Sequence, residues 1–177
     1  MKNVTSNEEK VKRIVNAGGP TAQEQRSAIV NNAYWHVCGI EKVAKKTKNN
    51  KVLIKAQAVK HALQAFGPYS DRIPGLRTST GSNAFHTHVI EKTTYIIEWS
   101  VIDKATKKIA ITGFGSHENY QFKKNPSQDK CNSLTQKYAA FFSQSQQHIE
   151  NIKKNKAPLQ NHHASHQTTS RTMPKHS

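Results

Sequence analysis

The chain lacks cysteine pairs and long apolar runs, and both absences narrow its class. Its two cysteines, Cys38 and Cys131, form no Cys-x-x-Cys motif, which argues against a disulfide framework and a zinc finger. No apolar run approaches the roughly 20 residues that a membrane-spanning helix needs, and the opening MKNVTSNEEK has no apolar signal core. We therefore expect a cytoplasmic protein without a transmembrane segment. Export by a route that needs no amino-terminal signal is the alternative.

Acidic residues are also scarce. Asp and Glu total 11 against 27 Lys and Arg, so the formal net charge is +16, while hydrophobic residues make up only 34% of the chain. A positive charge of this size attracts polyanions, and nucleic acid, with RNA favoured, is the first candidate partner. The alternatives are an anionic membrane surface, a protein partner that accepts a basic surface, and solvated lysine-rich tails without a ligand.

Both ends of the chain are polar, and the length suits one domain over residues 21–154. Residues 1–20 end in Gly-Gly-Pro and are expected to form a flexible arm; a short helix over residues 6–15, capped by Thr5 and Glu8, is the alternative. Residues 155–177 are rich in histidine and free of aromatics, which predicts a disordered basic tail. Its histidines could hold a stray metal ion: they include His162, His163 and His166.

Helical periodicity predicts two helices in the first half of the domain. Residues 21–46 carry an apolar stripe after the capping pair Thr21 and Glu24. Residues 51–66 are the second helix and stop at Gly67-Pro68, although a strand over residues 52–54 is an alternative.

A third helix is expected over residues 132–154, with Ser133 and Gln136 as its capping box. Its apolar stripe is suited to packing on a sheet or to binding a partner, and core packing is the preferred interpretation.

Between these helices lie three runs rich in β-branched and aromatic residues, at residues 84–90, 94–102 and 108–113. Their short polar links predict hairpins. Residues 67–83, with two prolines and three glycines, are expected to be loop. The fold class is therefore α+β: an antiparallel three- to four-stranded meander packed by two N-terminal helices and one C-terminal helix.

Alternation along the second predicted strand separates two faces. Tyr95, Ile97, Trp99 and Val101 share the face expected to be core, and Glu98 lies on the other face, expected to be partly open and functional.

The residues suited to proton transfer gather in this sheet region. His86 and His88 are two apart on one strand and so share a face; Glu98 and His117 follow on later segments. A two-residue turn at Lys92-Thr93 would set His86 opposite Trp99, whereas a shift of one residue would set it opposite Glu98. We predict His86, His88, Glu98 and His117 as catalytic, with metal ligation and a purely structural role as the alternatives.

Cations near this set could bind phosphate. The predicted substrate-binding residues are basic side chains and one tyrosine: Arg72, Arg77, Tyr120, Lys123 and Lys124. Metal-independent RNA cleavage needs a base, an acid and cations for the phosphorane, and the chain supplies all three. No cofactor and no metal are expected.

The helical elements, the arginine-bearing loop, the run TYIIEWSVIDKATKKIAITGFG and the closing His-x-x-Tyr from His117 to Tyr120 resemble the small RelE/ParE-type toxins, over residues 51–122. The resemblance implies a compact α+β domain that acts as an RNase or as a gyrase poison. Carried over by position, it implies Arg77, His86 or His88, and His117 with Tyr120 as site residues. The chain departs from that family in its greater length and in its additional helices at both ends.

The function expected from the sequence is RNA binding by a basic protein, with toxin-like endoribonuclease activity as the candidate reaction. The alternative is a non-enzymatic interaction or effector protein that docks through its basic surface.

Overall fold

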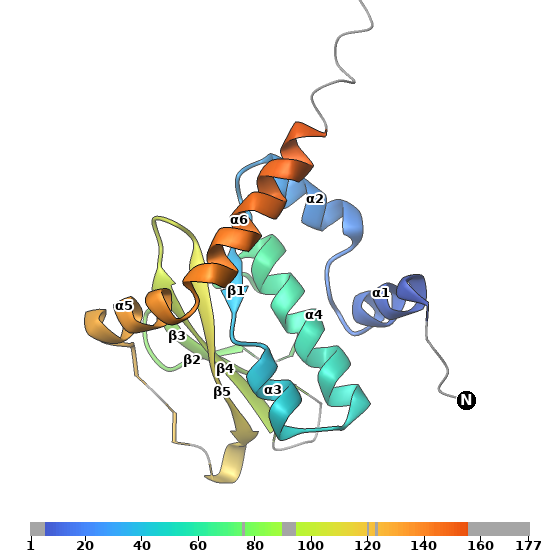
Figure 1. Ribbon diagram of the computed structural model, residues 1–177. Helices are drawn as coiled ribbons and strands as arrows, with labels where there is room; N and C mark the ends of the chain where they lie inside the picture. The colour runs from blue at the N-terminus through green and yellow to red at the C-terminus, as the bar shows by residue number, and fades with distance from the viewer. Residues whose placement is uncertain (1–5, 76, 90–94, 120, 123, 156–177) are drawn as a thin grey trace, which may run out of the picture.

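The computed structural model describes residues 6–75, 77–89, 95–119, 121–122 and 124–155. Over these residues, helices cover both faces of a five-stranded sheet whose order is β1-β5-β4-β3-β2 (Figure 1). The strands are β1 (His36–Cys38), β2 (Arg77–Ser79), β3 (Ala84–His88), β4 (Tyr95–Asp103) and β5 (Lys108–Ser116). The α-helices are α1 (Asn7–Asn16), α2 (Ala22–Val30), α3 (Glu41–Lys46), α4 (Asn50–Phe66), α5 (Gln128–Lys137) and α6 (Ala139–Lys154). Among the described residues, no helix is both long and apolar enough to cross a bilayer.

The centre of the sheet is the predicted antiparallel meander β3-β4-β5. Two short strands extend it: β2 pairs antiparallel with β3, and β1 pairs parallel with β5. The sheet is therefore mixed, and the α+β class is confirmed while the purely antiparallel sheet with three helices is not. The sequence did not predict β1, because this strand forms only by pairing with β5, which lies far along the chain.

The two faces of the sheet bury different clusters. Ile97, Trp99 and Val101 belong to the larger core, with α4 and α3, as the alternation predicts. Tyr95, predicted on the same core face, is instead 42% exposed at the start of β4. The opposite face packs Ile102 and other residues against α5 and the first turn of α6 (Figure 1). This second cluster covers only the end of the sheet where β4 turns into β5. The other end of the same face holds the histidines.

The single helix predicted over residues 21–46 is wrong. The Thr21–Glu24 capping box is present at its start, but α2 ends at Val30 and Asn32 takes a left-handed φ of 55°. Gly39 then turns the chain from β1 into α3 with a φ of 87°. A Cβ added at Gly39 would lie only 2.6 Å from the backbone carbonyl oxygen of Ile111. Glycine suits this position because it has no Cβ.

The helix predicted over residues 51–66 is confirmed as α4, and the strand alternative for residues 52–54 is wrong. The Asn49 side chain caps it by accepting hydrogen bonds from the backbone N–H groups of Lys51 and Val52. The helix stops at Gly67, whose φ is 81°.

The predicted C-terminal helix is two helices. It begins at Ser127, which caps α5, rather than at Ser133, and Tyr138 interrupts it with φ −105° and ψ 18°. The Tyr138 hydroxyl donates a hydrogen bond of 2.9 Å to the Glu41 carboxylate on α3. The break thus lets α5 and α6 follow different directions along the sheet.

The amino-terminal residues contain α1, so the helix alternative is the one found. Ser6, not Thr5, caps it by accepting from the Glu9 N–H. α1 packs on α4, and the Lys55 ammonium on α4 donates to the Ala17 carbonyl. In the predicted loop of residues 67–83, the structure adds strand β2. The tail beyond residue 155 lies outside the described residues.

Candidate functional site

Strand β3 places two imidazoles side by side on the sheet. Its register with β4 pairs His86 with Glu98 and His88 with Ile96. Of the two predicted registers, the one that sets His86 opposite Glu98 is therefore correct. The connection between these strands, residues 90–94, lies outside the described residues.

His117 reaches the same place from the far end of β5. It opens a short 3-10 helix, His117–Asn119, directly after the strand. In the β4–β5 pairing, Gly113 lies opposite Glu98 and Gly115 opposite Ile96. Since paired residues point to the same face, β5 presents no side chain beside the imidazoles at these two positions. The Gly-x-Gly pattern thus leaves space for the imidazole rings.

The three rings form one cluster. The His88 and His117 rings stack at a centroid distance of 5.1 Å, and the His86 ring lies 5.9 Å from each. One nitrogen from each ring lies within 4.8 Å of the others. The Phe122 ring covers part of the cluster, at 4.3 Å from His86 and 5.1 Å from His117. Sequence reasoning missed Phe122, which follows β5 in a segment without periodicity.

His86 is the buried member of the cluster, at 5% exposure. Its Nδ1 atom is buried and has no hydrogen-bond partner among the described residues. Burial lowers the pKa of His86 below its usual 6.5, and the positive charge of protonated His88 or His117 lowers it further. The ring is therefore neutral at pH 7, with a lone pair available.

Glu98, which pairs with His86 across β3 and β4, is fully buried. Its carboxylate accepts a hydrogen bond of 2.9 Å from the Thr112 hydroxyl. Thr112 is the extra residue of a β-bulge, because Glu98 pairs with Gly113 while Trp99 pairs with Ile111. The face predicted to be open is therefore closed at Glu98, which cannot touch a bound substrate directly.

Of the predicted phosphate-binding side chains, the structure describes those of Arg72 and Lys124. Arg72 forms an ion pair of 2.7 Å with Glu24 on α2 and stacks 4.0 Å above the Phe66 ring. Arg77 opens β2, where its backbone pairs with Thr87; its side chain, Tyr120 and Lys123 lie outside the described residues. Lys124 is exposed.

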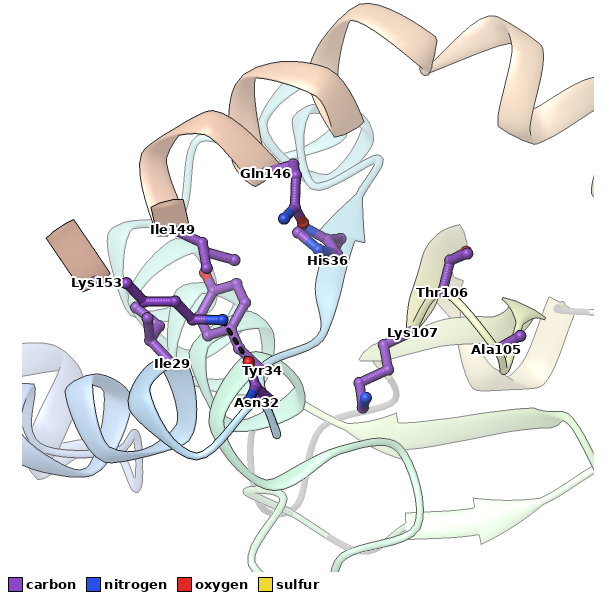
Figure 2. A pocket seen from close by; sticks show the side chains of 10 residues that line it. All are labelled: Ile29, Asn32, Tyr34, His36, Ala105, Thr106, Lys107, Gln146, Ile149 and Lys153. Carbon is purple, nitrogen blue, oxygen red and sulfur yellow. Dashed lines mark hydrogen bonds between the residues drawn. The ribbon is translucent and has the colours of Figure 1, made fainter. Parts of the chain in front are cut away.

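A second cavity, of about 170 Å³, lies at the opposite end of β5 (Figure 2). The end of α2, the start of β1, the β4–β5 hairpin and α6 enclose it. Its lining has two lysines and no carboxylate: Ile29, Asn32, Tyr34, His36, Ala105, Thr106, Lys107, Gln146, Ile149 and Lys153. No sequence pattern indicated it, since its walls come from four separate segments.

Three of the polar residues that line this cavity have hydrogen-bond partners. The Lys153 ammonium donates to the Asn32 side chain, the contact drawn in Figure 2. His36 Nδ1 lies 2.7 Å from the Ser145 hydroxyl. Burial lowers the pKa of His36, and the charges of Lys108 and Lys107 act in the same direction, whereas a hydrogen bond with Gln146 opposes them. With His36 satisfied, the histidine cluster is the stronger candidate site.

No family model, curated protein or solved structure matches this chain. The resemblance to RelE/ParE-type toxins therefore stays a prediction, and the site must be interpreted from its own chemistry.

Proposed function

We propose that the protein binds RNA and cleaves it by acid–base chemistry at the cluster of His86, His88 and His117. The observation that carries this proposal is the meeting of three imidazoles, from two strand ends, within 4.8 Å of one another. Histidine is the side chain best suited to exchange protons near neutral pH.

The cluster suits a reaction that needs an acid and a base together. The His88 and His117 rings stack at a centroid distance of 5.1 Å, and imidazole is the side chain that most often serves as general acid or general base. One ring can then act as base while another carries the proton that the leaving group needs.

In the proposed reaction, a neutral imidazole takes the proton of the ribose 2′-hydroxyl. The 2′-oxygen attacks the phosphorus atom, and the bond from phosphorus to the 5′-oxygen breaks. An imidazolium gives its proton to that 5′-oxygen, so the products are a 2′,3′-cyclic phosphate and a 5′-hydroxyl. His88 and His117 are the candidates for direct contact with RNA, and His86, which is buried, positions and polarises them.

The charge of the chain supports the choice of substrate. The net charge of +16 favours a polyanion, and exposed Lys124 follows the cluster closely along the chain. Arg77 and Lys123 are proposed to add phosphate contacts. Glu98 would act through the strands, by fixing the bulge at Thr112, rather than on the substrate.

Replacing His88 or His117 by alanine should lower RNA cleavage by on the order of 10²–10⁴. The assay is cleavage of an end-labelled RNA, with the cyclic phosphate identified by mass spectrometry, with and without chelator. His148→Ala, at an exposed position on α6, is the matched control and should keep full activity. Cleavage that survives both substitutions would point to another site or a contaminant. A folded protein that cleaves neither free nor ribosome-bound RNA would refute the enzymatic proposal.

The second candidate is the non-enzymatic interaction protein. Two observations favour it: Arg72 is engaged with Glu24 and Phe66, and Glu98 is fully buried. Both residues then serve the fold. RNA or protein binding without cleavage, unchanged in His88→Ala and His117→Ala, would select this function.

A further inference from the structure

We propose that His86, His88 and His117 bind one divalent transition-metal ion of the zinc class, each through one ring nitrogen. We propose further that the bound ion switches off acid–base chemistry at this site. Only the second statement rests on the proposed RNA cleavage.

The donor set fits such an ion. Zinc sites that keep an open position use three protein ligands, often imidazoles, at about 2.0–2.1 Å from the metal. Nitrogens around such an ion lie roughly 3.4 Å apart. The three ring nitrogens here lie within 4.8 Å of one another, so small side-chain rotations would close the site.

His86 supplies an independent indication. Its Nδ1 atom is buried and without a hydrogen-bond partner among the described residues, although buried polar atoms are nearly always paired. A metal ion, or a proton-sharing contact with a neighbouring imidazole, would satisfy that atom. The apolar ring of Phe122, against His86 and His117, would limit water around the ion.

The scaffold can hold the ligands in place. Two of them lie on one strand and the third follows the end of β5, so the sheet fixes their spacing. On β5, Gly113 and Gly115 lie opposite Glu98 and Ile96, the β4 residues that pair with His86 and His88, so β5 adds no side chain on that face at these two positions.

Metal binding and proton transfer exclude each other here. A ring nitrogen bonded to a metal has no lone pair for a base and carries no proton for an acid. A bound ion therefore inhibits cleavage, and its removal restores it.

The metal test is a titration of the full chain with Co²⁺, whose visible absorption reports tetrahedral nitrogen ligation, followed by displacement with Zn²⁺. The tail carries four further histidines, His162, His163, His166 and His176, so all proteins in the series have these four replaced by alanine. We expect one ion per chain. His88→Ala and His117→Ala should each weaken binding at least about 100-fold, since even changes to groups around a ligand cost 10–100-fold. His148→Ala should bind normally.

Far-ultraviolet circular dichroism checks that each variant is folded. Equal Co²⁺ affinity in the folded His88 and His117 variants would overturn the metal site, as would the absence of any Co²⁺ spectrum.

Cleavage is measured separately on the same proteins. One equivalent of Zn²⁺ should abolish it, and chelator should restore it. Zn²⁺ that binds but raises cleavage would overturn the inhibitory role. A protein that binds Co²⁺ through these histidines but never cleaves RNA would refute the proposed function and leave the metal site established.

Discussion

His61 on α4 is a histidine that the site does not use, and its burial has a measurable effect. Burial, together with the positive charge of Lys60, lowers its pKa from 6.5 to about 4. The folded protein therefore holds His61 neutral at pH values where the unfolded chain has already bound a proton.

Stability should consequently fall as the pH falls from 6.5 towards 4. Near pH 5 the loss from His61 alone is about 2 kcal/mol relative to pH 7. The check is urea unfolding at about pH 7.5 and pH 5, for the wild type and for His61→Gln.

The His61→Gln variant should lose this part of the pH dependence, whatever its stability at neutral pH. His36 and His86, whose pKa values are also lowered, contribute in the same direction in both proteins. His148→Gln is the control and should keep the full fall. An identical pH dependence in His61→Gln would show that His61 is readily protonated in the folded state.

At the same scale, some predicted site residues are placed by their own strand, whereas others are placed only by the way that strand pairs with its neighbours. Two histidines two apart on a strand must share a face, so the pairing of His86 with His88 could be predicted. Their meeting with His117 could not, because it depends on strand register and on the course of the chain after Ser116. The burial of Glu98 depends on the bulge at Thr112, which no local pattern indicates.

Among the elements, the junction between β1 and α3 is tightly constrained. Gly39 combines a φ of 87° with a backbone oxygen, that of Ile111, only 2.6 Å from where a Cβ would lie. Substitution there meets both a strained backbone and a collision with β5.

Gly39→Ala should lower the free energy of unfolding by at least about 2 kcal/mol, from the left-handed conformation and the displaced strand together. Chemical denaturation measures it. Lys45→Ala, at an exposed position on neighbouring α3, should change stability by less than about 0.5 kcal/mol. Equal free energies of unfolding for Gly39→Ala and Lys45→Ala would mean that Gly39 does not pack closely against β5 as described.

The elements that could be predicted are those whose secondary structure follows from the pattern of their own residues. α4 has a helical stripe and a capping asparagine, and β3, β4 and β5 have dense β-branched runs. The predicted helix over residues 21–46 failed because His36–Cys38 gains a partner strand in β5, which outweighs local periodicity. The break at Tyr138 likewise depends on its contact with Glu41, far away in the sequence.

For the molecule as a whole, the charge of +16 makes salt the simplest test of the partner. Single-stranded RNA held through roughly five phosphates should bind about 100-fold more weakly when salt rises from about 50 to 200 mM. Fluorescence anisotropy of a labelled oligonucleotide measures this. RNA affinity that does not change with salt concentration, or no RNA binding at low salt, would favour a protein partner.

Two arginines of one loop region make a matched pair within that experiment. Arg77→Ala should weaken binding and reduce the salt dependence by about one contact. Arg72→Ala should leave the salt dependence unchanged but lower stability, because Arg72 pairs with Glu24 and stacks on Phe66. If only Arg72→Ala reduced the salt dependence, Arg72 would be the phosphate contact and Arg77 would not.

The parallel pairing of β1 with β5 also bears on the order in which the protein is made. His36–Cys38 leaves the ribosome long before Lys108–Ala110, the residues with which it pairs in the described part of the sheet. Until then this apolar segment has no strand to join, and the cluster that Cys38 shares with Ala110 and α5 cannot close. Such distant contacts slow folding and leave a nascent chain exposed to aggregation. Residues 36–38 therefore gain their native neighbours only after β5 and α5 have been synthesised.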